Sequence, residues 1–185
     1  MAEQLRLDIP WPPSASREVL FFAVMPDAVD GARLTALGKQ ITPARLHPAA
    51  RFHLSLLGVR LDAGSRDKVI ADAQEVGGAV AAAPFEIVLP RVCSYGNSLV
   101  LCCAGDTAVS MLQLQQALLR ATGERRMGLR AQGGYSPHLT LAYRAPRVDP
   151  TPLMDPIRWL AREFVLVLSE QGRGRHTWLG RWPLK

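Results

Sequence analysis

The chain has 185 residues, a formal net charge of +6 at pH 7, and a composition that is 48% hydrophobic and 21% charged. These proportions exclude a disordered or fibrous chain and suit one well-packed domain. No apolar run could span a bilayer and the first residues lack a signal-peptide core, so we expect a cytoplasmic protein with no membrane partner. We separately expect a monomer.

The first half of the chain alternates between strands and helices. A proline-containing leader, expected to be loose and flexible, covers residues 1–18. Asp27 is placed to cap the first helix, and Gly96-Asn97 predicts a hairpin turn. The expected elements, from apolar patterning and breakers, are strand 19–24, helix 28–40, strand 52–59, helix 66–82, strand 85–92 and strand 98–103.

The second half continues with a helix, a basic loop and three strands. Gly123 ends the helix, and Arg125, Arg126 and Arg130 lie in the loop. A proline-rich connection with a short helical turn is expected after the first of these strands. The expected elements are helix 107–121, loop 124–134, strand 137–143, strand 164–169 and strand 177–182. The order of strands and helices predicts an α+β fold in one domain over residues 19–185.

Charge and cysteine content restrict the partners. Three of the 22 basic residues are lysines, so 22 − 3 = 19 are arginines. Arginine binds phosphate through two parallel hydrogen bonds, which makes a nucleic-acid partner plausible, although genomic base composition would also explain the excess. Cys93, Cys102 and Cys103 lack metal-ligand spacing and are expected to be buried, reduced thiols, with Cys102 and Cys103 on opposite faces of one strand.

One short pattern occurs twice, as His53-Leu54-Ser55-Leu56 and as His138-Leu139-Thr140-Leu141. In a strand, alternation places the histidine and the hydroxyl residue on one face and both leucines on the other. A single such motif is commonplace, but two of the chain's four histidines occupy equivalent places in nearly identical tetrapeptides. The other two, His47 and His176, belong to neither motif and are expected at the surface.

A pair of histidines suits acid–base chemistry at phosphorus. Histidine titrates near neutral pH, so one imidazole can act as base while the other acts as acid. The neighbouring hydroxyls can donate hydrogen bonds to the non-bridging oxygens, where negative charge must be held. This scheme requires no metal or other cofactor, and the chain has no HExxH motif or glycine-rich phosphate loop.

These residues resemble the two-histidine (2H) phosphoesterase superfamily, which is defined by two such motifs. Within it, the chain is similar to the bacterial RNA 2′,3′-cyclic phosphodiesterases, also called 2′-5′ RNA ligases or LigT-like proteins. The similarity extends to three segments in the same order: residues 20–26 (LFFAVMP), 137–141 (PHLTL) and 179–184 (LGRWPL).

The resemblance implies a two-lobed α+β fold with pseudo-twofold symmetry, in which antiparallel sheets line a central cleft and helices lie outside. It implies hydrolysis of 2′,3′-cyclic phosphate ends of RNA or nucleotides to a phosphomonoester. Carried onto this chain, it makes His53 and His138 the catalytic acid and base, and Ser55 and Thr140 the phosphate-binding residues.

The chain departs from the family pattern beside both motifs. An aromatic residue usually follows the first motif, but here Leu57-Gly58 follows directly. The arginine often found five residues after the second histidine is replaced by Tyr143, and Arg144 comes next. We expect Tyr135, Tyr143 and Arg144 as further substrate-binding candidates. Ligation, the reverse reaction, and an inactive module that binds RNA ends are the alternatives to hydrolysis.

Overall fold

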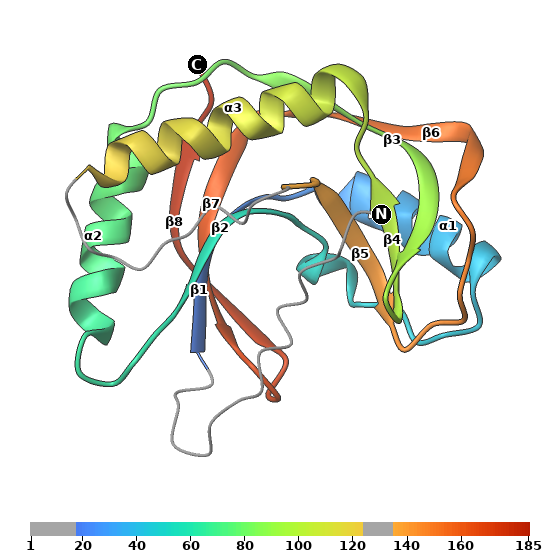
Figure 1. Ribbon diagram of the computed structural model, residues 1–185, viewed down its shortest axis with the longest axis horizontal. Coiled ribbons are helices and arrows are strands. Elements are labelled where there is room, and N and C mark those ends of the chain that lie inside the picture. The colour runs from blue at the N-terminus through green and yellow to red at the C-terminus, as the bar shows by residue number, and fades with distance from the viewer. Residues whose placement is uncertain (1–17, 124–134) are drawn as a thin grey trace.

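A computed structural model describes residues 18–123 and 135–185 of the chain. Its eight strands form one antiparallel sheet in the order β6-β3-β4-β5-β2-β1-β7-β8. Figure 1 shows these strands and the helices with their labels. The strands are β1 (Glu18–Val24), β2 (Leu54–Arg60), β3 (Phe85–Tyr95), β4 (Ser98–Cys102), β5 (His138–Tyr143), β6 (Thr151–Ala161), β7 (Glu163–Glu170) and β8 (Arg175–Pro183). The helices are α1 (Ala28–Ile41), α2 (Arg66–Ala79), α3 (Gly105–Thr122) and a 3-10 turn, η1 (Ala49–Arg51). The predicted α+β class is therefore confirmed.

The sheet consists of two four-stranded halves. One half holds β2, β1, β7 and β8, and the other holds β5, β4, β3 and β6. The order strand, helix, strand occurs in both halves, as β1-α1-β2 and as β4-α3-β5. The second strand of each such unit, β2 or β5, is the innermost strand of its half. The halves therefore meet between β2 and β5, where Leu54 pairs with Leu139.

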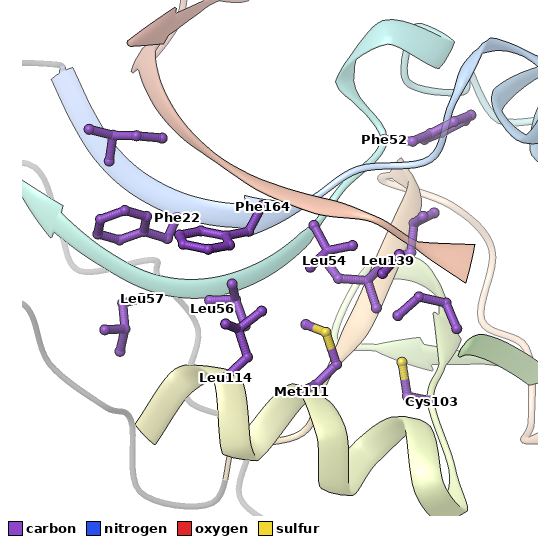
Figure 2. Packing of buried hydrophobic residues seen from close by; sticks show 14 of the residues in the cluster. Phe22, Phe52, Leu54, Leu56, Leu57, Cys103, Met111, Leu114, Leu139 and Phe164 are labelled. Carbon is purple, nitrogen blue, oxygen red and sulfur yellow. The ribbon is translucent and has the colours of Figure 1, made fainter. Parts of the chain in front are cut away.

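The helices pack on one face of this sheet, which we call the helix face. Leu34 of α1, Val69 of α2 and Met111 of α3 all belong to the main hydrophobic cluster. Figure 2 shows Met111 and Leu114 of α3 beneath the leucines of the two innermost strands. One helix thus braces the junction between the halves. The opposite side of the sheet, which we call the open face, carries two smaller apolar clusters.

Several local signals act as the sequence predicts. The side chain of Asp27 accepts a hydrogen bond of 2.9 Å from the backbone N–H of Asp30 at the start of α1. Gly96 has φ 58° in the two-residue turn between β3 and β4, a conformation that suits glycine. Gly123 has φ 50° where α3 ends. The leader prediction falls almost entirely outside the described residues, and so does the basic loop 124–134.

One strand contradicts the sequence prediction. Residues 151–161, expected to form a connection with a helical turn, form strand β6 beside β3. The segment contains Pro152 and Pro156, which cannot donate ladder hydrogen bonds. Because β6 is the outermost strand, it pairs on one side only and tolerates both prolines.

Candidate active site

The two histidine motifs lie side by side on the innermost strands. His53 directly precedes β2, and His138 is the first residue of β5. The strands are antiparallel and pair Leu54 with Leu139. Continuing this register by one residue in each direction places His53 opposite Thr140 and Ser55 opposite His138. The two histidines are then diagonal neighbours, about 7–8 Å apart between their backbones, with a hydroxyl residue at each remaining corner.

Alternation assigns these side chains to the open face. All four motif leucines are buried in the main cluster on the helix face, and Figure 2 shows Leu54, Leu56 and Leu139 there. Ser55 is exposed, and Thr140 is partly exposed. Both hydroxyls lie on the open face, where they can donate hydrogen bonds to a ligand. The predicted separation of leucines from histidines and hydroxyls is confirmed.

Each imidazole is oriented by a backbone carbonyl two residues earlier in the chain. His53 Nδ1 lies 2.7 Å from the carbonyl oxygen of Arg51, and His138 Nδ1 lies 2.8 Å from that of Ser136. A carbonyl oxygen can only accept a hydrogen bond, so Nδ1 of each ring carries the proton and donates it. In the neutral ring, Nε2 is then the unprotonated nitrogen. In both motifs Nε2 is therefore the ring nitrogen that can accept a proton.

Aromatic rings hold both imidazoles from the side. The ring of Phe21 lies 4.9 Å from that of His53, and the ring of Tyr95 lies 4.9 Å from that of His138 in an edge-to-face arrangement. The Tyr95 hydroxyl also forms a 2.8 Å hydrogen bond with the Ser136 hydroxyl. Because Ser136 also supplies the carbonyl bound to His138, Tyr95 supports this imidazole both directly and through its neighbour.

Burial lowers the pKa of both motif histidines below the ordinary value of 6.5. For His53, the hydrogen bond to the Arg51 carbonyl works against the lowering, and the charge of His138 adds to it. For His138, the hydrogen bond to the Ser136 carbonyl opposes the effect of burial on the pKa. Both imidazoles are therefore predominantly neutral at pH 7. A bound phosphate anion would raise these pKa values and allow one ring to hold a proton.

A third histidine lies beside the first motif, and the sequence prediction for it was wrong. His176 of β8, expected at the surface, is partly buried with its ring 5.9 Å from that of His53 and 5.7 Å from that of Phe21. Its pKa falls to about 4, mainly through burial and then through the charges of His53, Arg51 and His47. No sequence pattern connects His176 with the motifs, because the contact joins β8 to a residue beside β2, and these strands are not neighbours in the sheet.

The three additional substrate-binding candidates occupy different environments. The Tyr135 hydroxyl donates a 2.8 Å hydrogen bond to the Ser55 carbonyl, and the Tyr135 ring packs on the main core. Tyr135 therefore links the segment before β5 to β2. Tyr143 lies on the open face because an extra residue in β5 shifts the register there. It is exposed, and its ring contacts that of His47 at 4.7 Å. Arg144 lies just beyond β5, exposed, with φ 53°.

The three cysteines are free and buried. Cys102 belongs to the open-face cluster with Cys93, and Cys103 belongs to the main core, so adjacent cysteines do point to opposite faces. Within residues 18–123 and 135–185, no group of three His, Cys, Asp or Glu side chains is placed to hold a metal ion. In the same ranges, no helix is both long enough and apolar enough to cross a membrane.

Comparison with known proteins agrees with the class that the fold and the paired motifs define, the two-histidine phosphoesterases. Residues 25–173 match the family model of the 2′-5′ RNA ligase superfamily, and the chain belongs to this superfamily. A search of curated proteins gave no match.

Solved structures show the same fold. E. coli LigT in complex with 3′-AMP superposes with a TM-score of 0.71 at 24% identity, over 91% of this chain and 98% of that one. The protein TT0787 of Thermus thermophilus gives a TM-score of 0.69 at 22% identity, over 90% and 97% of the two chains. At these identities the likeness establishes the arrangement of the sheet and helices.

Proposed function

We propose that the protein hydrolyses 2′,3′-cyclic phosphate ends of RNA or nucleotides to phosphomonoesters by acid–base catalysis between His53 and His138. The observation that carries this proposal is the diagonal arrangement of the two imidazoles on adjacent strands, each with Nδ1 held by a carbonyl and Nε2 as its reactive nitrogen. A phosphorus atom between them would have a proton acceptor on one side and a proton donor on the other.

In this mechanism the neutral imidazole removes a proton from water through Nε2 while the water oxygen attacks phosphorus. The bond between phosphorus and one ribose oxygen breaks. The second imidazole, protonated at Nε2, donates its proton to that leaving oxygen, which becomes a free hydroxyl. The products are a phosphomonoester and two histidines with exchanged protonation states. A further proton exchange with solvent restores the site, and the scheme uses no metal ion.

Ser55 and Thr140 would stabilise the negative charge on the non-bridging oxygens. Each hydroxyl residue faces the histidine of the other strand in the continued register, so each side of the phosphate meets one imidazole and one hydroxyl. Hydrogen bonds to developing charge contribute more than those between neutral groups. The complex of E. coli LigT with 3′-AMP, a nucleoside phosphomonoester, supports a nucleotide substrate for a chain with the same fold.

Replacement of each motif histidine tests the mechanism. His53→Ala and His138→Ala should each lower kcat on a nucleoside 2′,3′-cyclic phosphate by roughly 10²–10⁴-fold, because each removes one proton-transfer partner. Activity of the wild-type protein should persist in EDTA. As a control, Arg158→Ala on the outermost strand should retain activity. Full activity in either histidine variant would contradict the proposal.

The superfamily name makes ligation the second candidate. Joining of a cyclic-phosphate end to a 5′-hydroxyl end uses the same acid and base in the reverse direction, with the hydroxyl replacing water. Incubating one RNA that carries both ends and separating joined from hydrolysed products would distinguish the two reactions. Binding of this RNA without either product would instead indicate an inactive RNA-end-binding module.

A further inference from the structure

An exposed tryptophan lies on the same face of the sheet as the paired histidines. Trp178 of β8 is 43% exposed. It pairs with Val167 of β7, which pairs in turn with Phe21 of β1. Phe21 and Val167 belong to an apolar cluster of the open face, so the row Phe21, Val167, Trp178 runs across this face from the first motif to the sheet edge.

The position of Trp178 relative to the reacting groups follows from this row. The ring of Phe21 lies 4.9 Å from that of His53. Trp178 is two strands further out, about 10 Å from Phe21 between backbones. His176 precedes Trp178 by two residues on the same face and contacts His53 at 5.9 Å. The indole is therefore beyond reach of a phosphate between the histidines but within reach of a group attached to it.

The guanidinium of Arg181 packs against one face of the Trp178 indole. The guanidinium of Arg181 lies 4.9 Å from the centre of the Trp178 ring. Arg181 is itself fixed by hydrogen bonds of 2.6 and 3.2 Å to the carboxylate of Glu163. Such an arrangement orders a large side chain before any ligand arrives, which lowers the entropic cost of binding. A planar group could stack on the other ring face.

Positive charge lies beside His176, at the turn that precedes β8. The side chain of Arg51, two residues before His53, reaches the turn before β8. Its Nη1 lies so close to Gly174 that a Cβ atom on this residue would be 3.0 Å away. The charge of Arg51 also acts on His176, which lies between this turn and Trp178 in β8, so a phosphodiester beside His176 would be attracted to the guanidinium.

We propose that Trp178 is a base-stacking subsite for the nucleoside that precedes the cyclic phosphate in an RNA strand. The subsite, which rests on the proposed function, makes the preferred substrate an oligonucleotide end and not a cyclic mononucleotide. The terminal nucleoside carries the phosphate on its own ribose and occupies the space beside the imidazoles, so the base that reaches two strands outward belongs to its neighbour. Stacking on an indole accepts any base, because every base has a π-face.

The decisive experiment compares two substrates in four proteins. The substrates are a nucleoside 2′,3′-cyclic monophosphate and a dinucleotide with a 2′,3′-cyclic phosphate end. The proteins are wild type, Trp178→Ala, Trp178→Phe and Leu160→Ala, the last a control with an apolar side chain of the same 43% exposure on β6. Trp178→Ala should reduce the preference for the dinucleotide, expressed as the ratio of kcat/KM values, by about tenfold. Trp178→Phe should recover most of the ratio, and Leu160→Ala should leave it unaltered.

A direct binding measurement separates failure of the subsite from failure of the proposed reaction. The dissociation constants of a 3′-phosphorylated dinucleotide and a 3′-phosphorylated mononucleoside are measured for the same four proteins. If wild type hydrolyses neither cyclic phosphate, the reaction is refuted, and a selective loss of dinucleotide binding in Trp178→Ala, about tenfold, still supports the subsite. Equal effects of Trp178→Ala on dinucleotide and mononucleotide, or no effect, would overturn it.

Discussion

His176 makes the stability of the protein depend on pH. Its pKa of about 4 in the folded protein lies below the ordinary value of 6.5, which applies to the unfolded chain. Between these values the unfolded chain binds a proton that the folded protein does not bind. The free energy of unfolding therefore falls as the pH falls from 6.5 toward 4, by up to about 1.4 kcal/mol per pH unit for this one group.

The magnitude is tested by replacing the titrating group. The full shift corresponds to about 3 kcal/mol, and partial access of solvent to the ring reduces the expected effect to about 1–2 kcal/mol. His176→Gln should remove this contribution. Between pH 7 and pH 4.5, wild type should therefore lose about 1–2 kcal/mol more of its unfolding free energy than the variant loses. Carboxylates titrate in both proteins, so their effect largely cancels in the difference.

Urea unfolding at pH 4.5, 5.5, 6.5 and 7.5 measures that difference directly. Ser169→Ala provides the control, because Ser169 is the cross-strand partner of His176 and its loss alters packing without removing a titrating group. The control should shift stability by the same amount at every pH. A difference between wild type and His176→Gln that stays constant across the series would refute burial of a neutral imidazole at this position.

Three further outcomes follow from the site and the core. Ser55→Ala and Thr140→Ala should each lower kcat/KM on a cyclic phosphate by about 10–100-fold, since each removes a hydrogen bond to a charged oxygen; unaltered steady-state rates would exclude them as phosphate ligands. Because both motif histidines have lowered pKa values and one must be protonated, kcat/KM measured from pH 4.5 to 8.5 should peak below pH 6.5, and a rise above pH 7 would contradict this assignment. Leu139→Ala, at a fully buried position of the junction, should lower the free energy of unfolding in urea by about 2–5 kcal/mol, and a loss below about 1 kcal/mol would show that the junction repacks.

The features predicted correctly are those that neighbouring residues determine. Alternation assigned His53 and His138 to the face opposite their leucines, since the side-chain period of a strand is fixed by its backbone. The hairpin at Gly96 and the cap at Asp27 likewise depend on residues within a few positions. None of these signals depends on a tertiary contact.

The features missed depend on position in the sheet. Pro152 and Pro156 argue against a strand unless the strand lies at an edge, and edge position is a property of the whole topology. Trp178 and His176 offered no motif, because only the register of β8 on β7 places them on the open face. Tyr143 shares the face of His138 only because β5 contains an extra residue opposite β4. A strict two-residue period would have placed it on the other face.

The junction between the halves explains why two motifs separated by 138 − 53 = 85 residues lie side by side. Leu54 and Leu139 meet across the strands, and both pack over Met111 of α3, so a helix from one half fixes the motif strand of the other. A slip of one residue between β2 and β5 would expose these leucines and turn the imidazoles inward. The free energy that buries the leucines therefore also sets the relative position of the histidines. The geometry of the candidate site is thus a consequence of core packing on the opposite face.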